Sequence, residues 1–318
     1  MKKIVLSLAI VSMLFSCNKQ EDSITTTDGN LAENVGNRGC YSDQHLKDQL
    51  AADPSLAKRM EEFELKAAEA IAQGRIVNGV LEIPVVFNVL YRTTAENISL
   101  AQIQSQIDVL NKDFNAANSD YNTANNPYSS VRANVGIRFV LDQVIRKSTT
   151  KSSWGTKDAM KKSTQGGLNP TSPTTKLNIW ICTIGGGILG YAQFPGGASA
   201  TDGVVLDGKY TGTTGTATAP FNLGRTATHE VGHWMNLRHI WGDATCGSDL
   251  VSDTPVHNAA NYGVPAVGHR STCTGTPLEM YMNYMDYTDD RGMYMFSAGQ
   301  KTRMLAIFNV GGSRASFR

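Results

Sequence analysis

The chain has 318 residues, of which 18% are charged and 41% hydrophobic, and its formal net charge at pH 7 is +1. A charge this close to neutral gives no electrostatic basis for binding nucleic acid, so we predict no nucleic-acid partner. The length suits one large domain or two smaller lobes once targeting residues are set aside.

The N-terminus has the pattern of an export signal. Two lysines precede an apolar run, Ile4 to Phe15, that is too short to span a bilayer. The run ends in Leu14-Phe15-Ser16-Cys17, which resembles the box of bacterial lipoproteins, where the cysteine is lipidated. We therefore expect a lipoprotein signal peptide over 1–17 and a lipid anchor on Cys17. Ordinary signal cleavage, which gives a secreted protein, is the alternative.

A polar segment follows the signal. Residues 18–39 contain few large apolar side chains and are predicted to form a tether. Its start, Lys19-Gln20-Glu21-Asp22, resembles acidic signals that send some lipoproteins to the outer face of the cell. The predicted location is the bacterial cell envelope or the medium, with membrane contact through the lipid anchor only.

Residues 40–74 are predicted to be a separate helical segment. Asp53 and Pro54 have N-cap and first-turn character, and Gly74 ends the helix. Its apolar side chains recur at helical spacing: Leu56, Met60, Phe63, Ala67 and Ile71.

The next part of the chain is predicted to contain a strand, a helix and then four further strands. Leu81–Tyr91 is a β-branched and aromatic run, and 99–115 is an amphipathic helix that begins with a Ser99/Gln102 capping box. The buried stripe of this helix is predicted to be Leu100, Ile103, Ile107, Leu110 and Phe114. Further strands are expected at 136–142, 176–182, 188–192 and 203–207.

The stretch 185–192 allows two interpretations. Gly185-Gly186-Gly187 is typical of a hairpin loop. The residues after it, 188–192, also suit an edge strand that binds an extended peptide as an additional strand.

The chemistry of the chain is concentrated in His229-Glu230-Val231-Gly232-His233-Trp234-Met235-Asn236-Leu237-Arg238-His239. On a helix, His229 and His233 lie one turn apart and can bind one metal ion. His239 can join them only if the chain turns near Asn236, a residue type that tolerates the left-handed conformation. Three imidazoles and a water form a catalytic zinc site, with Glu230 as the base that deprotonates the water.

The region after this motif is rich in loops. Cys246 and Cys273 are predicted to form a disulfide, since the protein is exported and little apolar periodicity holds this stretch together. Cys182, on an apolar strand, is expected to be a buried free thiol. A final helix is predicted over 297–308, with Ser297 and Gln300 as a capping box.

The stretch HEVGHWMNLRHIWGD resembles the zinc-binding signature of the metzincin metallopeptidases, and its Trp241-Gly242-Asp243 ending resembles the pappalysin family with its ulilysin-like enzymes. Metzincins usually have glycine where this chain has Asn236. Asn283-Tyr284-Met285-Asp286-Tyr287 is similar to the methionine turn of the same family. The similarity runs from about residue 80 to the end of the chain.

The resemblance implies an α+β fold of the metzincin type. The upper lobe, about 76–238, would contain a twisted, mixed five-stranded sheet, a backing helix and the active-site helix. The lower lobe, about 239–318, would be irregular and end in a helix. Met285 would lie beneath the zinc, and Tyr287 would help to hold the oxyanion.

The resemblance also implies latency and a second metal. Cys40, in Arg38-Gly39-Cys40-Tyr41, would bind the zinc from an inhibitory prosegment over 40–75 and keep the catalytic domain, 76–318, inactive until a cut near Arg75. Cysteine counting leaves a disulfide at Cys40 as the alternative. Calcium is expected at Asp249, Asp253 and Thr254, for which a solvated acidic loop is the alternative.

The sequence thus predicts an exported zinc endopeptidase that acts on proteins or peptides, and the resemblance implies that it cleaves beside arginine or lysine and is made as a latent precursor. One rival is a zincin of another clan whose third ligand is a distant glutamate. The other is a non-enzymatic surface binding module with a structural metal.

Overall fold

The computed structural model describes residues 37–72, 80–123 and 125–318. The predicted lipoprotein signal with Cys17, most of the tether and the predicted cut at Arg75 lie outside the described residues. None of the described helices combines the length and the apolar character that crossing a bilayer requires.

The helices and strands follow one another along the chain with short 3-10 turns between some of them. Their order is α1 (Ser42–Ala52), α2 (Ser55–Ala72), β1 (Leu81–Tyr91), α3 (Leu100–Phe114), β2 (Arg132–Ala133), β3 (Ile137–Ser148), β4 (Leu177–Ile181), β5 (Gly190–Ala192), β6 (Val204–Leu206), α4 (Arg225–Trp234), β7 (Phe296–Ser297) and α5 (Ala298–Ala306).

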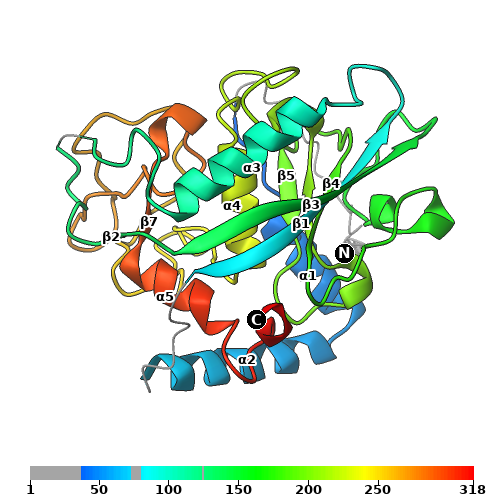
Figure 1. Ribbon diagram of the computed structural model, residues 1–318. Coiled ribbons are helices and arrows are strands. Elements are labelled where there is room, and N and C mark those ends of the chain that lie inside the picture. The colour runs from blue at the N-terminus through cyan, green and yellow to red at the C-terminus, as the bar shows by residue number, and fades with distance from the viewer. Residues whose placement is uncertain (1–36, 73–79, 124) are drawn as a thin grey trace, which may run out of the picture. The chain divides into compact units, whose positions relative to one another are not determined.

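A mixed five-stranded sheet organises the fold, as predicted (Figure 1). The strand order is β3-β1-β4-β6-β5, and all neighbours are parallel except β5, which runs antiparallel to β6 at one edge. Gly185, Gly186 and Gly187 all have positive φ and form a loop just before β5. This loop leads into an edge strand and is not a hairpin loop, because β5 pairs with β6 and not with β4. Binding of a peptide to this edge stays a prediction.

The main core lies between one face of the sheet and helices α3 and α4. Ile103 and Leu110 of α3 and Val231 of α4 pack there against strand residues such as Phe87 and Ile179. The opposite face carries a smaller cluster around Trp180 and Tyr191, covered by residues 154–168. Apolar side chains on both faces explain why the central strand β4 is buried throughout.

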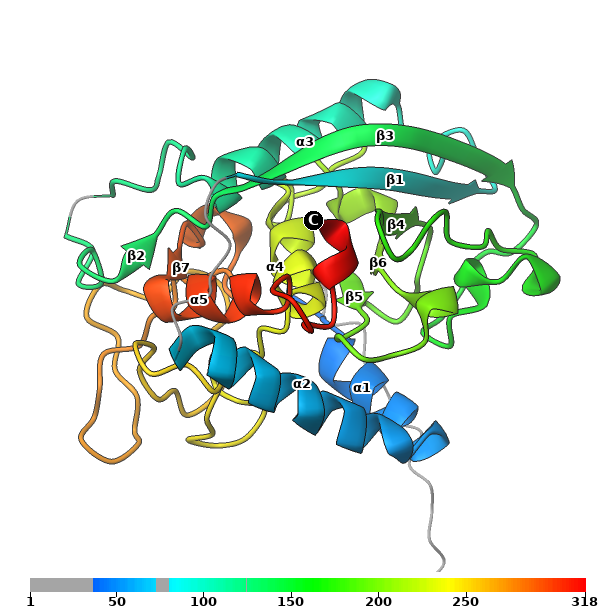
Figure 2. The same cartoon turned by 60° about the horizontal axis from the view of Figure 1, so that its bottom comes forward.

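Helices α1 and α2 pack against the rest of the protein. Helix α1 contacts β5, and α2 lies along α5, as both views show (Figure 1, Figure 2). The Glu64 carboxylate of α2 forms an ion pair with Arg303 of α5 and accepts a hydrogen bond of 3.0 Å from the Asn236 side chain.

Some elements differ from the sequence predictions. Strand β3 extends to Ser148 and pairs with β1 along its length, whereas the sequence predicted that it would end near residue 142. The prediction ended early because the second half of β3 is a polar edge without the expected apolar pattern. Leu100 is 58% exposed at the start of α3, so it lies outside the buried stripe. Ser99 caps α3, but the Gln102 side chain donates to the carbonyls of Gly208 and Thr211, so that only half of this capping box forms. The Ser297/Gln300 box is complete.

Candidate active site

Helix α4 carries the first two predicted ligands, and all of its residues are buried. The Nε2 atoms of His229 and His233 lie 3.1 Å apart. The helix ends after Trp234, and Asn236 adopts a left-handed φ of +74°. This turn brings Nε2 of His239 within 3.1 Å of Nε2 of His233, as the spacing of the motif predicts.

Each of the three imidazoles is oriented through its Nδ1 atom. Nδ1 of His229 lies 2.7 Å from the Tyr284 carbonyl oxygen, and that of His233 lies 2.8 Å from the Leu237 carbonyl oxygen. Nδ1 of His239 faces the Asp243 carboxylate. Because Nδ1 carries the hydrogen in each ring, the Nε2 lone pairs face one another, and burial lowers the pKa of His229 and His233 so that both stay neutral.

Cys40 completes this cluster. Ligand atoms of Cys40, His229, His233 and His239 all lie within 4.8 Å of one another. Three imidazole nitrogens and one sulfur are a tetrahedral donor set that suits zinc. Cys40 is a free thiol, so among the residues that the structure describes it does not form the alternative disulfide.

Glu230 is the acidic group of the cluster and is only 1% exposed. Burial raises the pKa of its carboxyl to about 7. The Ser42 hydroxyl donates to Oε2 of Glu230 at 2.7 Å, and the Cys40 thiol lies 3.4 Å from the same oxygen. The candidate base is therefore held by two side chains of the N-terminal segment.

Aromatic and sulfur-containing side chains enclose the three histidines. The Tyr287 ring lies 4.9 Å from the His239 ring, and its hydroxyl donates to the Cys40 carbonyl at 3.2 Å. Trp241 stacks on His239 with ring centroids 4.3 Å apart. Met285 lies against α4 so closely that a Cβ atom on Gly232 would come within 2.5 Å of its sulfur, which explains the glycine at this position.

The N-terminal segment also fills a charged pocket beside the cluster. Arg38 is 3% exposed, and its guanidinium lies 2.6 Å from the Asp290 carboxylate. It also donates to the Thr288 carbonyl and the Thr226 hydroxyl and lies over the Phe221 ring. The sequence analysis assigned Arg38 to the tether, whereas the structure buries this residue.

The other predicted site residues are the remaining cysteines and the acidic residues of the predicted calcium loop. Cys246 and Cys273 form a disulfide, and Cys182 is a buried free thiol. In the predicted calcium loop, Asp249 accepts from the Thr254 hydroxyl at 2.9 Å, while Asp253 accepts from Ser297 and Gly299 at the start of α5.

The sequence analysis missed several residues that contact this site. Ser42, Asp243, Asp290 and Phe194 contact a predicted ligand, the candidate base or Arg38. The Trp241-Gly242-Asp243 stretch gave a signal for Asp243, because an acidic residue four positions after His239 can reach its ring. The other three come from segments distant in sequence, and their pairing depends on the tertiary fold.

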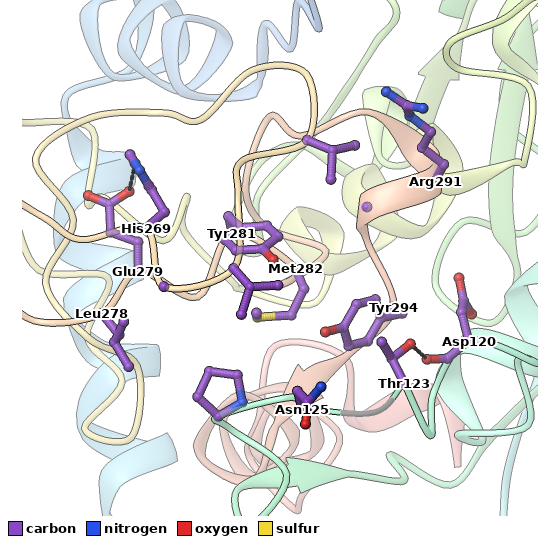
Figure 3. Close-up of a pocket in the computed structure, with 15 residues that line it drawn as sticks. Asp120, Thr123, Asn125, His269, Leu278, Glu279, Tyr281, Met282, Arg291 and Tyr294 are labelled. Atoms are coloured by element: carbon purple, nitrogen blue, oxygen red, sulfur yellow. Dashed lines mark hydrogen bonds and ion pairs between the residues drawn. The ribbon is translucent and has the colours of Figure 1, made fainter.

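A separate cavity of about 210 Å³ lies between residues 120–127 and the lower lobe (Figure 3). Tyr281, Met282 and Tyr294 line it, and the predicted zinc ligands do not. Its acidic groups already have partners, since Glu279 pairs with His269 and Asp120 pairs with Arg225. We assign it no role in the chemistry.

Comparison with known proteins agrees with this geometry. A family model described as Pregnancy-associated plasma protein-A, the pappalysin model, matches residues 173–309. An extracellular metalloprotease of Pyricularia oryzae is 36% identical over 260 residues, which is 76% of this chain and 80% of that protein. An extracellular metalloprotease 1 of Coccidioides posadasii is 35% identical and covers 72% and 77% of the two chains.

Solved structures are similar over nearly their whole length. A mutant of Tannerella forsythia promirolysin has a TM-score of 0.81 and 38% identity, and the match covers 88% of this chain and 97% of that chain. Mature mirolysin in complex with a cleaved peptide has a TM-score of 0.73 and 41% identity, with 76% and 96% covered. The α+β metzincin fold is thus confirmed, and the non-enzymatic alternative is set aside. The chain belongs to the pappalysin family and is a zinc metalloendopeptidase.

Proposed function

We propose that this chain is an exported zinc endopeptidase that is made as a latent precursor and cleaves beside arginine or lysine. The observation that carries the proposal is the buried cluster of three histidine nitrogens, the Cys40 thiol and the Glu230 carboxyl. Metal-assisted hydrolysis of a peptide bond needs a metal ligand set and a proton acceptor at one position.

Each residue of the cluster has a separate task. His229, His233 and His239 hold zinc, which when bound polarises a peptide carbonyl and makes water nucleophilic at neutral pH. Glu230, which follows His229 directly on α4, takes the proton of the attacking water. Tyr287 donates to the developing oxyanion, a task consistent with its present hydrogen bond to the Cys40 carbonyl.

Latency would arise because the segment 38–42 occupies all of these positions together. The Cys40 sulfur takes the fourth ligand position, and Ser42 binds the carboxylate that must accept a proton. The segment pairs with the sheet edge, since Tyr41 donates to the Gly190 carbonyl at 3.2 Å and Leu189 donates to the Gly39 carbonyl at 2.8 Å. A peptide substrate would need the same edge.

The preference for basic residues rests on Asp290. Its Oδ2 atom accepts from the Leu223 amide at 2.8 Å, while Oδ1 faces Arg38. Removal of Arg38 would leave a fully buried carboxylate oxygen without its cation, and a substrate arginine or lysine would restore the pair.

The domain boundaries are also a proposal. We extend the predicted prosegment, 40–75, to residues 38–75 because Arg38 is buried against the rest of the protein, and we keep the catalytic domain as 76–318. The precursor structure of the Tannerella relative matches a larger share of this chain than its mature form does, 88% against 76%, and the difference is roughly the size of the segment that contains α1 and α2.

Export and anchoring rest on the sequence of the N-terminus and on relatives named as extracellular enzymes. We assign lipidation to Cys17. Replacement of Cys17 by alanine should move the protein from the membrane fraction to the soluble fraction, which fractionation and fatty-acid labelling would measure. An unchanged distribution would contradict the anchor.

Calcium is a lesser proposal for the loop at Asp249 and Thr254. Asp249 is 5% exposed, and burial raises the pKa of its carboxyl to about 6, so a cation there would offset its desolvation. Calcium addition to the chelator-treated chain should raise its melting temperature, and Asp249→Asn should remove that increase. Both oxygens of Asp249 accept from the Thr254 hydroxyl, and both oxygens of Asp253 accept from Ser297 and Gly299, so a calcium ion would replace some of these hydrogen bonds.

The full chain tests the main proposal. Limited treatment with trypsin, followed by a trypsin inhibitor, should start cleavage of a quenched peptide library beside arginine or lysine. The Glu230→Ala variant treated identically, and wild type with a zinc chelator, should be inactive. Cys40→Ala should cleave without the treatment. A folded chain that binds zinc and cleaves no peptide would contradict the proposal.

A further inference from the structure

The N-terminal segment contacts the rest of the protein on both sides of the zinc ligands. On one side, Arg38 enters the pocket of Asp290. Cys40 lies among the histidines and forms a parallel bridge with Gly190 of the edge strand. On the other side, helix α1 brings Leu46 onto Phe194. The segment therefore has a basic contact and an apolar contact with the ligand cluster between them.

Phe194 follows the edge strand β5 and lies beside a metal ligand. Its ring centroid is 5.3 Å from that of His233. The ring is only 5% exposed in the full chain. A peptide that adds to β5 would pass Phe194 as it leaves the histidines.

The apolar cover of Phe194 comes from the segment that activation would remove. In this small cluster, Phe194 is the member outside α1 and α2. The other members are Leu46, Leu50, Leu56 and Met60. Release of α1 and α2 would expose the Phe194 ring next to His233, and the four side chains that share its cluster are three leucines and a methionine, all large and apolar.

We propose that Phe194 forms an apolar subsite that selects a large aliphatic side chain of the substrate. This side chain lies on the opposite side of the scissile bond from the basic residue held by Asp290. The inference rests on the proposed function, because the subsite opens only when the prosegment leaves. It adds a second specificity determinant, so that the preferred substrate has a basic residue on one side of the cut and an aliphatic residue on the other.

The geometry explains why Phe194 suits this role. The side chain of the preceding residue, Gln193, is fixed by two hydrogen bonds. It donates to the Ala198 carbonyl at 2.9 Å and accepts from the Thr201 hydroxyl at 2.7 Å. These bonds hold the turn after β5. The Phe194 ring is thereby carried on a fixed support, as a selective subsite requires.

The test uses the full chain activated by limited proteolysis and two series of quenched peptides. Each peptide has one arginine, placed after the cut in one series and before it in the other. Leucine, alanine or aspartate occupies the positions across the scissile bond. In the series that is cleaved, we expect kcat/KM to favour leucine over alanine by roughly 10-fold or more. Phe194→Ala should reduce this ratio to about 2-fold or less, and Phe194→Leu should retain most of it.

A matched control is Val310→Ala, which alters an apolar side chain that is 88% exposed and should leave the leucine-to-alanine ratio unchanged. Zinc content and melting temperature of each variant report folding. A leucine preference that survives in Phe194→Ala, or is missing in wild type while arginine is still selected, would overturn the subsite alone. No cleavage of any peptide by the folded, zinc-loaded chain would overturn the proposed function and the subsite together.

Discussion

The Ser42 hydroxyl lies 2.7 Å from Oε2 of Glu230 and accepts a hydrogen bond of 2.8 Å from the Ala192 amide. It is fully buried, so this contact joins the start of α1, the edge strand and the candidate base in one network. In the proposed latency, the effect of Ser42 can be separated from that of Cys40, because the hydroxyl binds the candidate base whereas the sulfur lies among the predicted metal ligands.

We expect Cys40→Ala to leave part of the latency in place, because Ser42 still binds Glu230 and Arg38 still fills its pocket. The double variant Cys40→Ala with Ser42→Ala should show roughly 10-fold to 100-fold higher activity before processing than Cys40→Ala alone, since a buried hydrogen bond to a charged group contributes roughly 1.5–3 kcal/mol. Initial rates on a quenched arginine peptide measure this. Equal rates for the two variants would show that Ser42 does not restrain the base.

Asp290 should determine the preference for basic residues. Asp290→Asn keeps an oxygen that can accept from the Leu223 amide but removes the charge that pairs with Arg38. The ratio of kcat/KM for an arginine peptide to that for its leucine counterpart should fall by roughly 100-fold. Asp289→Asn, the neighbouring carboxylate, is the matched control. An unchanged ratio in Asp290→Asn would assign the selection to another residue.

Acid should weaken the docking of α1 through His45. This ring is 4% exposed, and burial together with the Lys161 ammonium lowers its pKa from 6.5 to about 4, although Asp158 lies 3.4 Å away. The undocked ring binds a proton more readily than the docked ring does. The contribution of His45 to docking is therefore complete above pH 6.5 and is lost as the pH falls towards 4, by roughly 3 kcal/mol at most.

Hydrogen exchange of α1 amides between pH 7.5 and 4.5, corrected for the intrinsic exchange rate, would measure this effect. His45→Gln should remove most of the pH dependence, which separates His45 from the carboxylates around it, Asp48 and Asp158. The same acid sensitivity in His45→Gln as in wild type would assign it to those carboxylates.

Asp243 should affect zinc affinity, because its carboxylate faces Nδ1 of His239 and fixes the orientation of that ring. Asp243→Ala should weaken zinc binding by about 10–100-fold, a typical loss for a group that orients a metal ligand. Titration with a competing chelator measures this without any peptide substrate. Asp243→Asn retains an acceptor oxygen, so its zinc affinity should lie between that of wild type and that of Asp243→Ala. Wild-type affinity in Asp243→Ala would limit Asp243 to a role in the loop.

Much of this fold could be predicted from local pattern. Strand β1 follows directly from its apolar run, and the left-handed turn at Asn236 follows from the need to bring His239 back to His233. The polar half of β3 could not be predicted, because an edge strand needs apolar residues on only part of its surface.

Of the candidate site, too, the part within one local motif could be predicted and the part formed by distant segments could not. The three histidines and Glu230 lie within one short motif, so their spacing alone indicates their contact. The pairs Arg38–Asp290 and Ser42–Glu230 join residues separated by 252 and 188 positions. No local pattern specifies such pairs, since they exist only after the sheet edge and the lower lobe have formed.

The long separation between Arg38 and Asp290 also has a consequence for biosynthesis. Arg38 leaves the ribosome early, whereas its partners Thr226, Thr288 and Asp290 are made much later. During translation the segment therefore has no pocket to bind. Arg38 can therefore dock only after residues up to Asp290 have been made and folded, and a chain truncated before Asp290 would lack this pair.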